Sequence, residues 1–255
     1  FNGSLTSDKN LSILAKNSIV TKEGSDLYTQ EDGYLKAHTA ALGGDVRADG
    51  TLTIETDETL AVKNVTAGKA AALKAGTSLT AANVTAGEAA TLNAGTELNA
   101  QNVKSDKGTA TLKAGTDLTA LNVAAGKDAT LTADKNISVH DVTADGNASL
   151  TAGQDATIDG AVTAKGSASL TAQHNATIGG AVTTGVDFKA NVSNDLTVNG
   201  AITAQKNIAL HTGNDLSVNG ATLSHGVTQI DAGHDVRFNG SLTSDKNLSI
   251  LAKNS

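Results

Sequence analysis

The two ends of this chain carry the same eighteen residues. Residues 1–18 read Phe-Asn-Gly-Ser-Leu-Thr-Ser-Asp-Lys-Asn-Leu-Ser-Ile-Leu-Ala-Lys-Asn-Ser, and residues 238–255 repeat them without a substitution. A match of that length does not arise by chance. We therefore interpret the chain as a window from a tandem array with a 237-residue unit. An array of this kind predicts a long, linear object rather than a globular domain.

A shorter repeat lies inside that unit. An apolar residue of a Val-Thr-Ala-like step recurs with a 19–20-residue period, so that one unit holds about twelve repeats. The chain carries two such series, which we predict to be buried columns: Val65, Val84, Val103, Val123, Val142, Val162 and Val182, and Leu73, Leu92, Leu112, Leu131, Leu150 and Leu170.

Each repeat contains three short runs in which apolar and polar residues alternate. In residues 83–101 the runs are 84–86, 90–94 and 98–100, and Gly, Asp, Asn and Lys lie between the runs of such repeats. A period of two predicts strands, and these intervening residues favour turns. We therefore predict an all-β fold, a right-handed parallel β-helix (β-solenoid) with three strands per 19–20-residue coil and about twelve coils. Twelve coils stacked at about 4.8 Å would give a rod roughly 58 Å long. The hand is taken from the crossover preference of parallel strands.

Two other repeat folds fit poorly. A leucine-rich repeat has a similar period, but its Leu-x-x-Leu-x-Leu pattern is missing, and no window keeps a helical period. We expect one continuous solenoid segment over 1–255, with irregular coils in 1–45, regular coils in 46–237 and the start of the next outer repeat in 238–255. Because neither end shows a capping sequence, we expect further copies of the same repeat at both ends.

Composition excludes several kinds of site. The chain has no Cys, Pro, Met or Trp, and aromatic residues make up 2%. Disulfides and thiolate metal sites are therefore excluded. A net charge of −7 disfavours nucleic acid as a partner. No apolar stretch reaches about 18 residues, so we expect no membrane span.

The candidate binding residues are few. Tyr28 and Tyr34 fall in the irregular region, where loops could present them to sugars or protein; the alternative is a longer turn with two half-buried tyrosines. Gly43-Gly44 stands alone and is interpreted as a turn.

One acidic turn column is a weak candidate for Ca²⁺. Asp195, Asp215 and Asp235 are each separated by one repeat length and should stack, which would bring carboxylates together. Asp and Asn also favour turns through their own hydrogen bonds, and Asn at other positions of this column favours that alternative. We expect no cofactor. We interpret the six histidines as scattered surface residues: His38, His140, His174, His211, His225 and His234.

Enzymatic activity is not expected. Enzymes built on β-helices need paired carboxylates or basic residues clustered in a cleft made by long loops. Here the loops are short, and the two arginines, Arg47 and Arg237, do not cluster.

Residues 64–81 (Asn-Val-Thr-Ala-Gly-Lys-Ala-Ala-Ala-Leu-Lys-Ala-Gly-Thr-Ser-Leu-Thr-Ala) and 160–172 (Gly-Ala-Val-Thr-Ala-Lys-Gly-Ser-Ala-Ser-Leu-Thr-Ala) resemble the haemagglutinin repeats of filamentous haemagglutinin-like exoproteins. The resemblance covers nearly all of 46–255 and, more loosely, 1–45. It implies a right-handed β-helical shaft on a very large protein of two-partner secretion, exported by an outer-membrane β-barrel transporter. Such proteins act as adhesins or as the stalks of contact-dependent toxins.

Three functional hypotheses follow. The first is a structural shaft segment of a secreted or surface-anchored bacterial adhesin or filament, which projects a tip or adheres by repeated contacts with a host or bacterial surface receptor. The second is a self-assembling extracellular fibre subunit that stacks end to end. The third is a carbohydrate-binding or carbohydrate-degrading β-helix.

Overall fold

The structure is a computed structural model that describes residues 2–253. All regular structure in that range is β, so these residues contain no helix long and apolar enough to cross a membrane. The chain divides into two compact units, residues 1–127 and 128–255. The prediction of one continuous segment over 1–255 stays a prediction.

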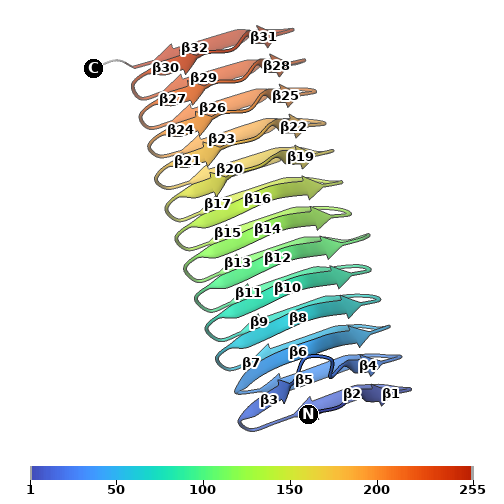
Figure 1. Ribbon diagram of the computed structural model, residues 1–255. Coiled ribbons are helices and arrows are strands. Elements are labelled where there is room, and N and C mark those ends of the chain that lie inside the picture. Colours follow the sequence, from blue (N-terminus) through green and yellow to red (C-terminus); the bar gives the residue numbers. More distant parts are fainter. Residues whose placement is uncertain (1, 254–255) are drawn as a thin grey trace. The chain divides into compact units, whose positions relative to one another are not determined.

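The first unit is a stack of parallel strands. Each strand pairs with its equivalent one coil away, as Leu92 of β11 pairs with Leu73 of β9 and Leu112 of β13. Figure 1 labels these strands along the stack. The strands are β1 (Leu5–Ser7), β2 (Leu11–Leu14), β3 (Ser18–Thr21), β4 (Leu27–Thr29), β5 (Gly33–Ala37), β6 (Thr39–Ala48), β7 (Leu52–Thr56), β8 (Leu60–Ala67), β9 (Ala71–Ala75), β10 (Leu79–Ala86), β11 (Ala90–Ala94), β12 (Leu98–Ser105), β13 (Ala110–Ala114) and β14 (Leu118–Ala125).

The second unit has the same parallel pairing. Val162 of β19 pairs with Val142 of β16 and Val182 of β22, one coil away on either side. The strands are β15 (Ala129–Ala133), β16 (Ile137–Ala144), β17 (Ala148–Ala152), β18 (Ala156–Ile158), β19 (Val162–Ala164), β20 (Ala168–Ala172), β21 (Ala176–Ile178), β22 (Val182–Thr184), β23 (Phe188–Val192), β24 (Leu196–Val198), β25 (Ile202–Ala204), β26 (Ile208–Thr212), β27 (Leu216–Val218), β28 (Thr222–Ser224), β29 (Thr228–Ala232), β30 (Val236–Phe238), β31 (Leu242–Ser244) and β32 (Leu248–Ala252).

These pairings confirm an all-β, parallel β-solenoid with coils of 19–20 residues, about twelve in all. The predicted right hand stays a prediction. The number of strands per coil differs from the prediction in the first unit. There the third run of one coil and the first run of the next form one strand, as in β10, so most coils have two strands.

The length of one corner explains this difference. In β10 two residues, Ala82 and Asn83, separate the buried Ala81 from the buried Val84, and the backbone stays extended through the bend. In most coils of the second unit a third residue is inserted at this corner. With this residue the extended backbone is interrupted, so that β18 ends at Ile158 and β19 starts at Val162. The same insertion accounts for several of the 20-residue coils.

The core is built from the alternate residues of each strand. In β11, Ala90, Leu92 and Ala94 are buried, while Thr91 faces solvent. The valine and leucine series lie in the core, each residue at most 3% exposed: Val65, Val84, Val103, Val123, Val142, Val162, Val182, Leu73, Leu92, Leu112, Leu131, Leu150 and Leu170. Burying one such side chain contributes roughly 1.5–3 kcal/mol. A single coil offers few of them, so stability comes mainly from contacts between neighbouring coils.

A ladder of side-chain amides follows the corner of the first unit. Each Asn donates its Nδ2 to the Oδ1 of the residue one coil before it, over 2.7–2.8 Å. The ladder runs from the carboxylate of Asp45 through Asn64, Asn83 and Asn102 to Asn122. It fixes the register of the coils at the point where the strand bends.

Candidate functional site

The irregular coils hold Tyr28 in a fixed position. Its hydroxyl donates to Asp49 Oδ2 over 2.7 Å, and the Arg47 guanidinium carbon lies 5.4 Å from the ring centroid. Arg47 also donates through Nε and Nη2 to Asp49 Oδ1. The hydrogen bond to Asp49 raises the pKa of Tyr28, and the same bond, together with Arg47, lowers the pKa of Asp49. A shallow pocket beside this cluster is lined by Asp26, Leu27, Tyr28, Asp45 and Arg47.

Tyr34 lies apart from that cluster. It belongs to β5, which pairs with β2 and β7, whereas Tyr28 belongs to β4, in the other sheet of the coil. The Tyr34 hydroxyl donates to Glu55 Oε2 over 3.1 Å. Partial burial, followed by this hydrogen bond, raises the pKa of Tyr34. The structure therefore does not bring the two candidate tyrosines together in one site.

A short loop over residues 22–26 distinguishes the longest coil. It lies against Gly43 and Gly44, where a Cβ would overlap the backbone of the loop, at Ser25 above all. The side chain of Thr21 accepts from the Gly43 N–H over 3.1 Å. Gly43-Gly44 is therefore not a turn: both residues lie inside β6, where the register with β8 shifts between Leu42 and Asp45. The interpretation as a turn was wrong because the close partner of the glycines is distant in sequence.

The same loop reaches beyond the next coil. Lys63 Nζ lies 2.6 Å from Glu23 Oε1, although the two residues are 40 positions apart. The hydrogen bond and charge of Lys63 lower the pKa of Glu23, and Glu23 raises the pKa of Lys63 in return. The surface of the irregular coils is therefore polar. Its charged side chains pair with one another, as in the Glu23–Lys63 ion pair and the Arg47–Asp49 contact.

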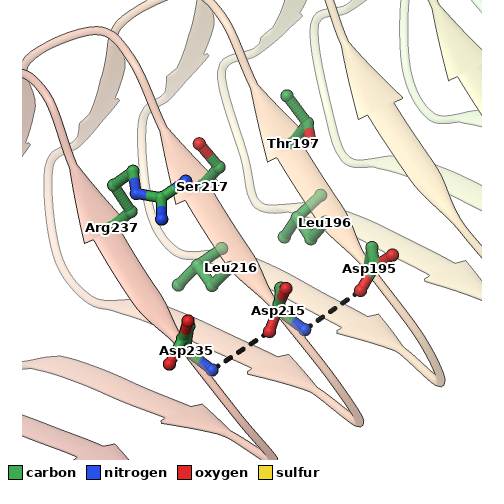
Figure 2. A pocket seen from close by; sticks show the side chains of 8 residues that line it. All are labelled: Asp195, Leu196, Thr197, Asp215, Leu216, Ser217, Asp235 and Arg237. Atoms are coloured by element: carbon green, nitrogen blue, oxygen red, sulfur yellow. Dashed lines mark hydrogen bonds between the residues drawn. The ribbon is translucent and has the colours of Figure 1, made fainter.

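The acidic column lies in the second unit. Asp195, Asp215 and Asp235 line a surface groove with Arg237 on the adjoining strand, as Figure 2 shows. Asp195 Oδ1 accepts from the backbone N–H of Asp215, and Asp215 Oδ1 from that of Asp235, each over 3.1 Å. Asn214 Nδ2 also donates to Asp195 Oδ1 over 2.7 Å. One oxygen of the Asp195 carboxylate and one of the Asp215 carboxylate therefore accept a hydrogen bond from a backbone N–H of the next coil.

This arrangement recurs in the turns of both units. The side-chain oxygen of one coil accepts the N–H one coil further on, as Asp32 Oδ1 does from Thr51 and Asp187 Oδ1 from Asn207. Asn occupies equivalent positions, since Asn175 Oδ1 accepts from Asp195 N–H. Asp and Asn share an acceptor oxygen but differ in charge, so the column depends on hydrogen bonding rather than on charge. Residues 2–253 contain no group of three His, Cys, Asp or Glu that could hold a metal ion.

The histidines do not gather into one site. Five of them lie within 4.0 Å of a carboxylate: His38, His140, His174, His211 and His225. The closest pairs are His225 with Asp245, at 2.7 Å, and His174 with Asp155, at 2.9 Å. The backbone N–H of Asn175, with a smaller contribution from His174, lowers the pKa of Asp155.

Sequence reasoning missed the partners of Tyr28 and the Glu23–Lys63 pair. A signal for the first was present, because Arg47 is about one coil after Tyr28 and therefore stacks beside it. Nothing in the spacing of Glu23 and Lys63 indicates their contact, which depends on the path of the loop over the glycines.

No protein-family model matches the chain, and the searches of curated proteins and of solved structures found no match to it either.

Proposed function

We propose that this chain is a structural shaft segment of a large secreted or surface-anchored bacterial adhesin or filament. The observation that carries the proposal is the register of the coils: equivalent residues lie beside one another from coil to coil within each unit. Short segments join the strands, and in several of them an Asp side chain accepts a hydrogen bond from the backbone of the next coil. Such a surface suits a spacer, which needs stiffness and regularity more than a reactive cleft.

The finer parts of the proposal rest on the sequence resemblance. A member of the filamentous haemagglutinin-like group would leave the cell through an outer-membrane transporter barrel and would act without enzymatic activity or cofactor. Its partners would be further copies of the repeat and a receptor on a host or bacterial surface. The net charge of −7 agrees with a well-solvated extracellular surface and with the absence of nucleic acid among its partners.

Surface labelling of intact cells tests this proposal. Antibodies raised against the folded chain should bind unpermeabilised cells of the source organism, and external protease should remove the signal. Electron microscopy with the same antibodies should then place the label on filaments. Label found only after permeabilisation would contradict the proposal.

The alternative is a fibre of separate subunits that stack end to end. It predicts particles whose length grows with protein concentration, whereas a covalent shaft segment keeps one length. Sedimentation velocity over a wide concentration range separates the two, and the mass of the native polypeptide on a denaturing gel gives a second measure.

Carbohydrate contact is a further candidate, favoured by the fixed Tyr28 ring beside a shallow pocket. Aromatic rings and carboxylates are groups that commonly meet sugar rings and hydroxyls. A glycan-binding screen tests it, with Tyr28→Ala as the disabling variant and Tyr34→Ala as the matched control. Binding lost in the first variant and kept in the second would support this role, and no binding by the native chain would end it.

A further inference from the structure

Within residues 2–253, the duplicated segment adopts the same local structure at both of its positions. Residues 5–7 and 242–244 form β1 and β31, and the next strands, β2 and β32, both begin at the leucine six residues further on. The turn between the strands is also the same: Ser7 Oγ donates to Asn10 O over 3.2 Å, and Ser244 Oγ to Asn247 O over 3.2 Å. Residues 2–16 and their counterparts 239–253 therefore form the same two strands and turn in two different surroundings.

At the first position, the next coil of the chain covers one side of this coil. β4 pairs with β1, and β5 with β2, with Leu27 beside Leu5 and Leu35 beside Ile13. The N–H groups of Leu5, Leu11 and Ala15 each donate to this covering layer over 2.9 Å, to the carbonyls of Asp26, Asp32 and Lys36. Ser4 Oγ and Asn10 Oδ1 accept from its backbone over 3.1 and 3.0 Å.

At the second position the structure shows the opposite side of the same coil. β31 and β32 pair with β28 and β29 of the preceding coil. The N–H groups of Asp245 and Lys253 donate to that coil over 3.0 and 3.1 Å. On the other side, Leu248 and Ile250, the counterparts of Leu11 and Ile13, are each 47% exposed.

We propose that the exposed face of β31 and β32 is a docking surface for a second copy of residues 19–45, carried by another 237-residue repeat. The occupant follows from identity: at its first position the same coil pairs with Leu27–Thr29 and with Gly33–Lys36, so the same side chains and N–H groups at the second position fit the same sequence in the same register. Leu242, Leu248 and Ala252 would then donate as Leu5, Leu11 and Ala15 do. The inference deepens the proposed shaft function, because it names the joint between repeats.

A lengthened chain tests the joint. Residues 19–67 are appended after residue 255, and amide hydrogen exchange is followed residue by residue. We expect the N–H groups of Leu242, Leu248 and Ala252 to exchange at least about tenfold more slowly than in the original chain. Those of Asp245 and Lys253 already donate to the preceding coil and should change less. A matched extension of the same composition in scrambled order should give no protection.

Variants placed in the appended copy leave residues 1–255 untouched. Leu35→Asp puts a carboxylate against Ile250 and should abolish the protection, whereas Tyr34→Asp, at an outward position one residue earlier, should preserve it. Unchanged exchange in the native extension, or equal protection by the scrambled one, would overturn the proposal. Association of the unextended chain that protects these amides would also overturn it, because residues 1–18 of another molecule would then reach the face. Cell-surface labelling is unaffected by either result, so the joint and the shaft function can fail separately.

Discussion

Inward-facing threonines interrupt the apolar columns of the second unit. The hydroxyls of Thr184, Thr222 and Thr228 are buried without a hydrogen-bond partner among residues 2–253. Thr222 lies between Ile202 and Leu242, and Thr228 between Ile208 and Leu248. A buried hydroxyl that finds no partner costs about 1–3 kcal/mol.

Thr222→Val and Thr228→Val should therefore stabilise the protein, by about 1–2 kcal/mol each, because valine keeps the shape and removes the unpaired group. Denaturant unfolding measures the change. Thr197→Val, on the outward face of β24, is the matched control and should change stability by less than about 0.5 kcal/mol. A fall in stability in the Thr222 variant would show that its hydroxyl has a partner.

Asp155 should give the chain an acid-sensitive contact. Its pKa is lowered in the folded state, so its contribution to stability is present above the unfolded value of about 3.9 and is lost as the pH falls through the folded pKa. Asp155→Asn keeps the oxygen that accepts from Asn175 N–H but removes the charge. The stability difference between native chain and variant should shrink between about pH 5 and pH 2, as measured by unfolding at a series of pH values. A difference that stays constant would contradict this.

At the scale of an element, the amide ladder is expected to fix the corner of the first unit. Asn83→Ala removes the donor to Asn64 and the acceptor for Asn102, and should destabilise the unit by about 1–2 kcal/mol. Asp45→Asn, at the end of the ladder, retains the acceptor for Asn64 and should have a small effect. Denaturant unfolding compares the two, and equal effects would show that the ladder adds no more than a surface contact.

The loop over residues 22–26 packs directly on Gly43 and Gly44, which is possible because these two residues have no side chain. Gly44→Ala would place a methyl group against the carbonyl of Ser25, so the loop must lift, at a cost of about 1–3 kcal/mol. Limited proteolysis should then cut near Gly24 faster than in the native chain. Gly3→Ala meets nothing within 4 Å and is the control. Equal cleavage of the Gly44 variant and the native chain would place the loop elsewhere.

Strands were predictable from the sequence where a local pattern determines them. The alternation in Ala90–Ala94 predicts which side chains are buried without knowledge of neighbouring coils. The fusion of two runs in β10 was not predictable in the same way, because the bend at Ala82 and Asn83 keeps extended backbone where a turn was expected. Gly43 and Gly44 were misread because their need for space comes from residues about 20 positions earlier. Long-range packing therefore accounts for these differences.

The candidate site was predictable only in part. The equal spacing of Asp195, Asp215 and Asp235 predicts that they stack. The structure adds that the carboxylates of Asp195 and Asp215 accept hydrogen bonds from the backbone N–H groups of the next coil. Tyr28 and Tyr34 lie in different sheets because β4 and β5 pair with different strands of the neighbouring coils. The short distance between the two tyrosines in the sequence does not predict this.

At the scale of the whole molecule, the same coil sequence occurs at two positions, residues 1–18 and 238–255. A solenoid gains stability by adding neighbours, since each new coil covers the open side of the last. Because the next repeat begins with the sequence of the first coil, one repeat can follow another without a new kind of interface. The 237-residue repeat, with its roughly twelve coils, would then act as a module of fixed length. Such a module suits a shaft whose reach depends on the number of repeats.

The central claim, that residues about 20 positions apart lie side by side in parallel coils, is tested most directly by paired cysteines in a chain that has none of its own. Thr91 and Thr111 face outward on adjacent coils, so their Cα atoms should be about 4.8 Å apart, within reach of a disulfide. Thr53 and Thr91 lie two coils apart, at about 10 Å, beyond that reach. Mild oxidation of the folded chain should join Thr91→Cys to Thr111→Cys and leave the Thr53→Cys, Thr91→Cys pair free, as counted by thiol titration. Equal oxidation of both pairs, or oxidation of the distant pair alone, would contradict the stacked-coil account.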